Sequence, residues 1–457
     1  MMRKFIGTVV AVLALSAPMV RAETLADALI AAYRNSNLLD QNRAVLRAAD
    51  EDVAIAVADL RPVIAFAAQA GYARAEFLAP TGGRGVNEGL SGTLSLTADM
   101  TVFDFGRNKL AVDVAKESVL ATREALIGVE QGVLLSAVQA YVNVRLSQEI
   151  VALRESNFRL ITQELRASQD RFEVGEITRT DVSIAEARLA SSRASLAAAQ
   201  GDLMVARESY KAATGAYPGR LAGLPAAPKT ARTMADAQAV AQRTHPAIRQ
   251  AQHEVTIAEL NVARGKANLK PNLSARASLG VDGDGLNTDG IGLVLNQTLY
   301  AGGKLSALYR KSRAGLDASR SGLHQSSLLV AQNVGNAWSS LLVSAASIDA
   351  SSRQITASQT AFDGVREEAT LGARTTLDVL DAEQELLDAR AARLQAEAGR
   401  YVGVYALLSA MGLLTADHLG LGIPTYDAAA YYNAVKTAPA TSAQGRRLDK
   451  ILEKIGN

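Results

Sequence analysis

The chain of 457 residues repeats one pattern twice, and this duplication constrains its fold more than any other feature. The stretch VGEITRTDVSIAEARLA at 174–190 is matched about 197 positions later by LGARTTLDVLDAEQELL at 371–387. Two further pairs, LRP with LKP and FDFGR with YAGGK, occur in the same order in both halves. The chain is therefore one unit duplicated in tandem, at 23–216 and 232–421, with a Pro- and Gly-rich linker at 217–231 between the copies.

Each copy contains a region of alternating apolar and polar residues, which predicts one β-hairpin near 63–102 and another near 271–299. The segment 63–76 alternates poorly and is predicted as a strand from its position alone. Strands with one apolar and one polar face are typical of membrane β-strands in an exported protein, and an ordinary half-buried sheet is the alternative. The offset between the copies drops by about 12 in this region, which predicts a longer loop at 78–89.

Four such strands cannot close a barrel, because known membrane barrels have about eight strands or more. An open sheet edge within lipid would leave backbone groups unsatisfied, at a cost of several kcal/mol each. If these strands cross a membrane, several copies of the chain must therefore combine to close the sheet.

The rest of each unit predicts long helices. The segments 107–173 and 304–370 contain no proline and carry apolar residues at seven-residue intervals, the spacing of a coiled-coil seam. At 1.5 Å per residue each helix would run roughly 100 Å, far longer than the helices of globular domains. Each segment ends at the turn of the duplicated stretch and returns as a shorter helix, at 180–214 and 376–412.

The N-terminal segment 1–22 has the features of a secretory signal peptide. Arg3 and Lys4 precede an apolar run that ends in a small-x-small cleavage site, so the mature chain is expected to begin at Glu23. No other stretch is expected to reach the roughly 18 apolar residues of a membrane-spanning helix, which predicts that the protein leaves the inner membrane. The chain has no cysteine, so neither a disulfide nor a lipid-anchoring cysteine is available.

Composition and motifs argue against other classes of function. The net charge is +2, with acidic and basic residues interspersed, which argues against nucleic acid as a partner. The four histidines show no metal-ligand spacing, and no nucleophile and base form a recognisable pair. We therefore expect neither an enzyme nor a bound cofactor or metal.

The tandem duplication, LRP and LKP before the hairpins, FDFGR and YAGGK after them, and GEITRTDV and GARTTLDVLDAE at the distal turns resemble the TolC family of outer-membrane channels. The resemblance covers about Thr24 to Leu421. It implies an α+β membrane protein and a homotrimer in which four strands per chain form a 12-stranded β-barrel. The barrel would continue into a long α-helical coiled-coil tunnel in the periplasm, surrounded by a belt of short helices and the C-terminal segment 422–457.

The resemblance also implies a function. The chain would be the exit duct of a tripartite export system in the outer membrane of a Gram-negative bacterium, in contact with outer-membrane lipid. Its partners would be a periplasmic adaptor (membrane fusion) protein and an inner-membrane pump of the ABC or RND type. Secreted proteins and small toxic compounds are both possible cargo. RAVLRAADEDV at 43–53 resembles type I secretion members, and this resemblance favours the type I secretion branch of the family. The alternative is a periplasmic coiled-coil adaptor or structural protein without a pore.

Carried over to matching positions, the resemblance assigns roles to residues at the distal turns. Asp378 and Asp381 correspond to an acidic ring at the periplasmic entrance of the tunnel, where carboxylates around a narrow axis would select cations. Arg374, Asp181 and Thr180 correspond to links between coils that hold this entrance shut. Without the resemblance, the two acids are ordinary first-turn residues favoured by the helix dipole, and Arg374 is a solvated turn charge.

The helix-turn tips at Gly175 and Gly372 are the expected docking surface for the adaptor. The sequence departs from the family at Ala369, where a tyrosine often joins the closing network. This departure predicts an entrance that is held less tightly.

Overall fold

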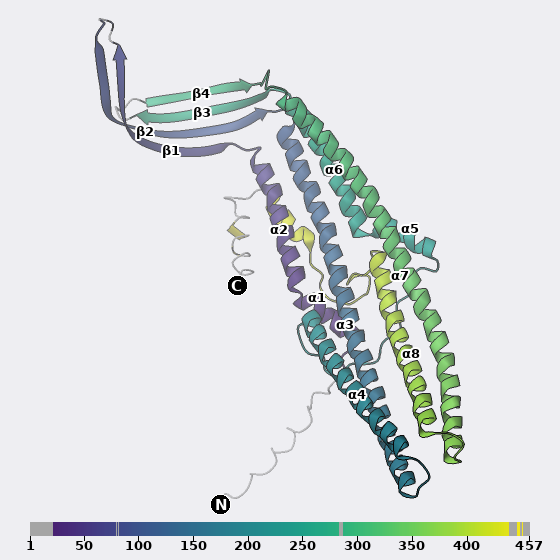
Figure 1. Ribbon diagram of the computed structural model, residues 1–457. Coiled ribbons are helices and arrows are strands. Elements are labelled where there is room, and N and C mark those ends of the chain that lie inside the picture. The colour runs from purple at the N-terminus through teal and green to yellow at the C-terminus, as the bar shows by residue number, and fades with distance from the viewer. Residues whose placement is uncertain are drawn as a thin grey trace, which may run out of the picture.

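A computed structural model describes residues 22–78, 80, 82–282, 287–437, 446–447 and 450. A curved sheet extends from one end of an elongated helical bundle, and the helix-turn tips lie at the opposite end (Figure 1). The predicted signal peptide, apart from Ala22, and most of the predicted tail after residue 437 lie outside the described residues.

The sheet has four strands, and every neighbouring pair is antiparallel. The order is β1-β2-β3-β4, so the pairing of β2 with β3 joins the two copies of the duplicated unit in one sheet. Among the described residues, the first and the last strand each keep one edge that pairs with no other strand. The strands are β1 Val63–Leu78, β2 Arg84–Phe103, β3 Asn272–Asp282 and β4 Asn287–Asn296.

The first hairpin is longer than the second because its strands are longer. Leu78 pairs with Arg84, so most of the predicted loop at 78–89 belongs to β2, and that prediction is wrong. The strands of the first hairpin contain 16 and 20 residues, against 11 and 10 in the second. Gly and Asn residues suggested a loop here, yet the ladder continues through them, with Arg74 and Glu88 paired across the strands at 3.7 Å.

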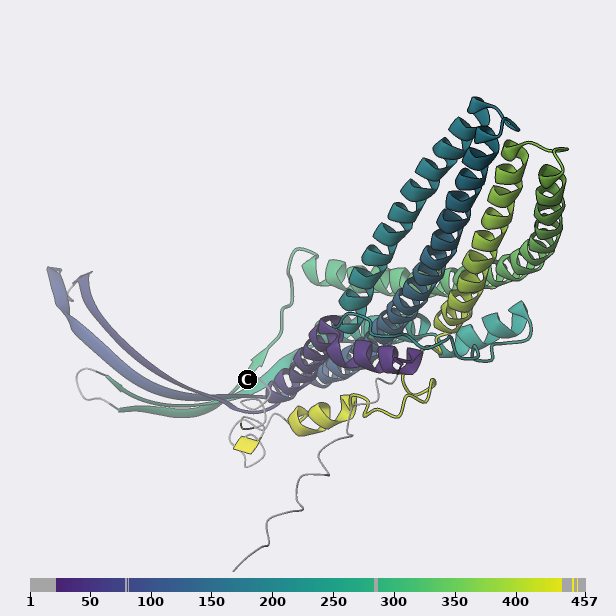
Figure 2. The ribbon, with the colours of Figure 1, turned by 90° about the horizontal axis from the view of Figure 1, so that it is seen from below.

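The long helices match their predicted bounds. The first is α3 Arg107–Glu173, which returns as α4 Arg179–Thr214, and the second is α7 Lys304–Thr370, which returns as α8 Thr376–Ala410. We refer to α3 with α4 as the first coil and to α7 with α8 as the second coil. The two coils run side by side, with their tips at the same end of the molecule (Figure 2). The remaining helices are α1 Leu25–Asn35, α2 Asn37–Ala58, α5 Met234–Thr244, α6 Pro246–Ala267 and α9 Ala428–Val435.

The main core lies halfway along the bundle, where α1, α4 and α8 pack against α3. Its largest buried side chains include Leu134, Tyr141, Tyr210 and Leu408. The hydroxyl of Tyr141 donates hydrogen bonds to the carbonyls of Glu23 and Ala222, so the buried ring keeps its polar atom satisfied. This core holds the start of the first copy against the linker between the copies.

By length and composition, α3 contains one stretch apolar enough to cross a membrane, contrary to the sequence-based expectation. Apolar residues suit this part of α3 because the helix packs against five others, α1, α2, α4, α6 and α8. The apolar stretch therefore fits a core helix of the bundle.

Candidate functional site at the coil tips and the sheet

Both coils turn through the same backbone geometry at their tips. Gly175 and Gly372 have φ angles of +78° and +76°, a left-handed conformation that glycine adopts without strain. In each turn the next residue donates a backbone hydrogen bond to the carbonyl five residues back, from Glu176 to Arg171 and from Ala373 to Glu368, both at 2.9 Å. This is the Schellman arrangement that ends a helix.

The residue before each tip glycine is a large apolar residue in contact with solvent. Val174 is 72% exposed and Leu371 is 84% exposed. Both tips therefore expose an apolar side chain to solvent at the equivalent position.

Asp181 and Asp378 both occupy the third position of a helix. The carboxylate of Asp181 accepts hydrogen bonds from the backbone and hydroxyl of Thr178, and that of Asp378 accepts the same pair from Thr375, all between 2.7 and 2.9 Å. These are capping boxes, and the bonds to Thr178 and Thr375 lower the pKa of each carboxyl. Within one protomer both acids thus stabilise a helix start, and Thr178, rather than Thr180, is the capping residue.

The other two predicted site residues are also paired within the protomer. Asp381 accepts a hydrogen bond from the guanidinium of Arg188, which joins α8 to α4. Arg374 Nε lies 2.7 Å from Glu368 Oε2, on the other side of its own turn, and this carboxylate raises the pKa of Arg374. Within the described residues of one protomer, the ion-pair partner of Arg374 is therefore Glu368 and not Asp181.

The structure adds links between the two coils that sequence reasoning missed. Arg171 Nη2 of α3 donates to the carbonyl of Ala369 in α7 at 3.4 Å, at the position where the family often has a tyrosine. Further from the tip, Glu164 of α3 pairs with Arg366 of α7 at 3.7 Å. A buried hydrogen bond to Glu383 also connects α3 with α8. The sequence signal for this bond was the acidic residue itself, which stands among the apolar residues of the segment 376–412.

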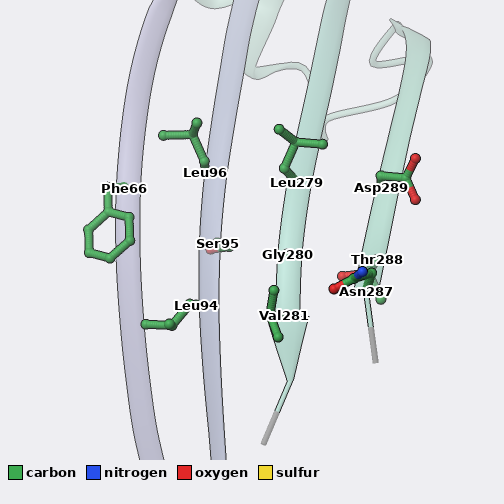
Figure 3. Close-up of a pocket in the computed structure, with 10 residues that line it drawn as sticks. All are labelled: Phe66, Leu94, Ser95, Leu96, Leu279, Gly280, Val281, Asn287, Thr288 and Asp289. Carbon is green, nitrogen blue, oxygen red and sulfur yellow. The ribbon is translucent and has the colours of Figure 1, made fainter. Parts of the chain in front are cut away.

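The sheet presents one apolar and one polar face, as predicted. Register places Phe66, Leu96 and Leu279 side by side on three adjacent strands, and Figure 3 shows them with Leu94 and Val281 along one surface of the sheet. On the intervening positions, Arg276 and Asp99 form an ion pair of 2.6 Å across β3 and β2. A broad apolar face without a covering layer is what a strand surface in lipid requires.

The sequence was compared with models of known protein families. The model described as "Outer membrane efflux protein" matches residues 29–216 and 238–413, one match in each copy of the duplicated unit. The chain belongs to the outer membrane efflux protein family. Family membership confirms the sequence-based resemblance and places the protein in the outer membrane as an efflux protein.

Proteins similar to this chain carry names of the same kind. The outer membrane efflux protein BepC of Brucella suis is 37% identical over 91% of both chains. The outer membrane protein TolC of Escherichia coli is 22% identical, over 67% of this chain and 68% of TolC. The alkaline protease secretion protein AprF of Pseudomonas aeruginosa is 26% identical, over 65% of this chain and 64% of AprF.

A solved structure confirms the fold class. CusC, reported to form a transmembrane channel, matches 86% of this chain and 92% of its own with a TM-score of 0.76. Sequence identity is 19%, so this likeness concerns the fold. The four strands and the two long coils of this efflux protein therefore have the fold of CusC, in agreement with the expected architecture.

Proposed function

We propose that three copies of this chain form one channel, which conducts cargo from the periplasm to the exterior as the duct of a tripartite export system. The observation that carries the proposal is the open sheet, in which the outer edges of β1 and β4 pair with no other strand of the described residues. In lipid such edges are costly, and pairing β4 of one copy with β1 of the next removes them all in a closed ring.

Three copies suit a duct better than two. Two four-stranded sheets would give eight strands, and a barrel of eight strands is narrow enough for side chains to fill. Three sheets give twelve strands and leave room for a channel. The polar face, with Arg276 and Asp99, would then line the interior, while the apolar face would contact lipid.

The helical part also has surfaces that a second copy would cover. On α7, Leu328, Leu342 and Val343 are each at least 59% exposed in the protomer, and on α4 Met204 and Val205 are 64% and 66% exposed. Burying such side chains contributes about 1.5–3 kcal/mol each. Packing of neighbouring protomers along these faces supports a closed helical tunnel below the barrel.

At the tunnel entrance, trimer symmetry would gather three copies of Asp378 and Asp381 into the predicted acidic ring. Arg374, Asp181 and Thr180 would lie near the neighbouring coils and help to hold the entrance shut. The exposed Val174 and Leu371 beside Gly175 and Gly372 would form the surface on which a periplasmic adaptor docks. These roles fit side chains that are exposed or half-buried in the protomer.

An inner-membrane pump of the ABC or RND type would deliver the cargo through the adaptor. The name of BepC favours efflux, whereas the name of AprF favours secretion of a protease. The greater identity and coverage of BepC favour efflux as the principal role, while the same duct would also admit unfolded secreted proteins.

Disulfide trapping tests the closed ring, because the natural chain has no cysteine. The variants combine Phe66→Cys in β1 with Ile291→Cys, Leu293→Cys or Leu295→Cys in β4, all on the apolar face. Within one sheet these strands are about 14 Å apart, at about 4.8 Å per strand, so a disulfide between them must join two chains. Oxidation in outer membranes should give covalent dimers and trimers, and no larger species.

A matched control uses Phe66→Cys with Leu96→Cys, which pair directly within one protomer. This control should give only monomers on a denaturing gel. If the β1–β4 variants stay monomeric at every register, or if the ladder continues beyond three copies, the trimeric duct is wrong.

A further inference from the structure

Glu383 of α8 is a buried acidic residue in the seam between the two coils. It is 7% exposed, and Asn157 of α3, which faces it, is 8% exposed. The side-chain amide of Asn157 donates a hydrogen bond of 2.6 Å to Oε1 of Glu383. This bond ties the first coil to the second, because it joins residues 226 positions apart in different copies of the unit.

The second carboxylate oxygen of Glu383 has no hydrogen-bond partner within the described part of the chain. Glu383 lines a cleft of about 290 Å³ between α3, α7 and α8, and both arginines of the cleft have other partners. Arg366 pairs with Glu164 at 3.7 Å, and Arg390 donates to Gln359 Oε1 at 2.7 Å. In the part of the chain that the structure describes, no ion pair therefore compensates a charge on Glu383.

This environment favours the protonated form of Glu383. The pKa of Glu383 is raised to about 7, chiefly by burial and also by the nearby Glu164, while the bond from Asn157 and the charge of Arg366 act in the opposite direction. An ionised carboxylate in such a site carries a buried charge with a single hydrogen bond, whereas the neutral acid carries no charge and still accepts the bond from Asn157. The charged groups around the cleft are Glu164 on α3, Asp363 and Arg366 on α7, and Arg390 on α8.

We propose that Glu383 and Asn157 form a proton-sensitive latch, which holds the two coils of a protomer together when Glu383 is protonated and loosens when Glu383 ionises. The latch rests on the proposed duct, because separation of the coils would widen the tunnel near its entrance. Glu383 and Asn157 are positioning residues in this scheme and need not touch the cargo.

The direction of the pH effect follows from proton linkage. In separated coils Glu383 would be hydrated, and its pKa would return towards the ordinary value of 4.5. The joined state therefore binds the proton more tightly, so acid favours joined coils and a rise in pH from about 4.5 to about 7 favours separation. A difference of more than two pKa units corresponds to a change of more than about 100-fold in the ratio of joined to separated coils.

The first copy provides a natural control for this latch. Glu186 occupies the position of Glu383 in the duplicated stretch, but its side chain is exposed on α4. A substitution there removes the same charge from the same type of helix without touching the seam between the coils.

Two spin labels measure the separation directly in the full-length protein. They are attached through Arg159→Cys on α3 and Glu385→Cys on α8, both exposed positions near the latch in a cysteine-free chain. The label distance should increase between pH 5 and pH 8 in the natural background and with Glu186→Gln. It should remain short at both pH values with Glu383→Gln, because glutamine keeps the acceptor for Asn157 and cannot ionise.

Conductance of bilayer-inserted channels over the same pH range gives a second measurement. Open probability should rise towards pH 8 in the natural protein and stay low with Glu383→Gln. The latch is overturned if Glu383→Gln keeps the natural pH dependence, or if the label distance in the natural protein does not change with pH. Channels that conduct nothing at any pH would contradict the duct, whereas the label distances would still decide the latch.

Discussion

The two long helices, α3 and α7, have the same length but bury very different numbers of residues. Both long helices contain 67 residues, yet fourteen residues are buried on α3 and six on α7. The first lies in the middle of the bundle, with other helices on several sides, and the second lies at its edge. The duplicated pattern thus specifies a helix, and its position in the bundle decides how much of that helix is covered.

The turns show the same contrast at the level of single charges. In the first coil the basic Arg171 precedes the turn and pairs with Glu176 at 3.1 Å, whereas in the second the acidic Glu368 precedes the turn and pairs with Arg374. Asp381, one helical turn after its capping aspartate, is replaced in the first coil by Ile184. The glycine turn and the capping box are therefore common to both copies, whereas the charges that could serve a gate are concentrated in the second copy.

The acidic ring offers the largest expected difference between the two coils. The double substitution Asp378→Asn with Asp381→Asn should abolish block by a compact trivalent cation added from the periplasmic side, because it removes every carboxylate of the ring. Single-channel current in planar bilayers, with and without the cation, measures the block. In the natural protein the block should persist down to about pH 4, since the bonds from Thr375 hold the pKa of Asp378 below its usual value of about 3.9.

Glu186→Gln in the first coil is the matched control, since it removes an exposed acid from the equivalent helix and leaves the proposed ring and gate residues unchanged. Its block by the cation should equal that of the natural protein. A double variant that is blocked as strongly as the natural channel would leave Asp378 and Asp381 with their helix-capping role alone.

A smaller effect is expected from the turn charges. Arg374→Ser should increase conductance several-fold, because it removes the positive charge through which the proposed gate holds neighbouring coils together. Glu176→Gln, which breaks the ion pair of the other turn and leaves Arg171 bonded to Ala369, should leave conductance unchanged. Equal effects of both substitutions would show that the turn pairs stabilise tips and do not distinguish a gate.

Much of the fold could be predicted because its signals are local. The bounds of α3 and α7 follow from a glycine with positive φ before each helix, the absence of proline within it, and the glycine turn after it. Hairpin length could not be read in this way, because polar and glycine residues pair as well in a ladder as they bend in a loop. Side-chain partners such as Arg188 for Asp381 depend on how two coils meet, which no local pattern records. For the same reason Glu186 and Glu383 look alike in the sequence and differ in burial.

The smallest predicted effect concerns the tip turns, where the two coils should behave alike. No atom outside the turn lies within 4 Å of a Cβ added at Gly175 or Gly372, so a substitution there meets backbone strain and no clash. Gly175→Ala and Gly372→Ala should each weaken the local turn by about 1–2 kcal/mol, the cost of a left-handed conformation for an ordinary residue. Asparagine, which tolerates this conformation, should cost less at both positions. Hydrogen exchange of the tip amides compares the four variants. Unequal losses at the two glycines would mean that one tip is supported by contacts beyond its own turn, and the common backbone geometry would then not imply common stability.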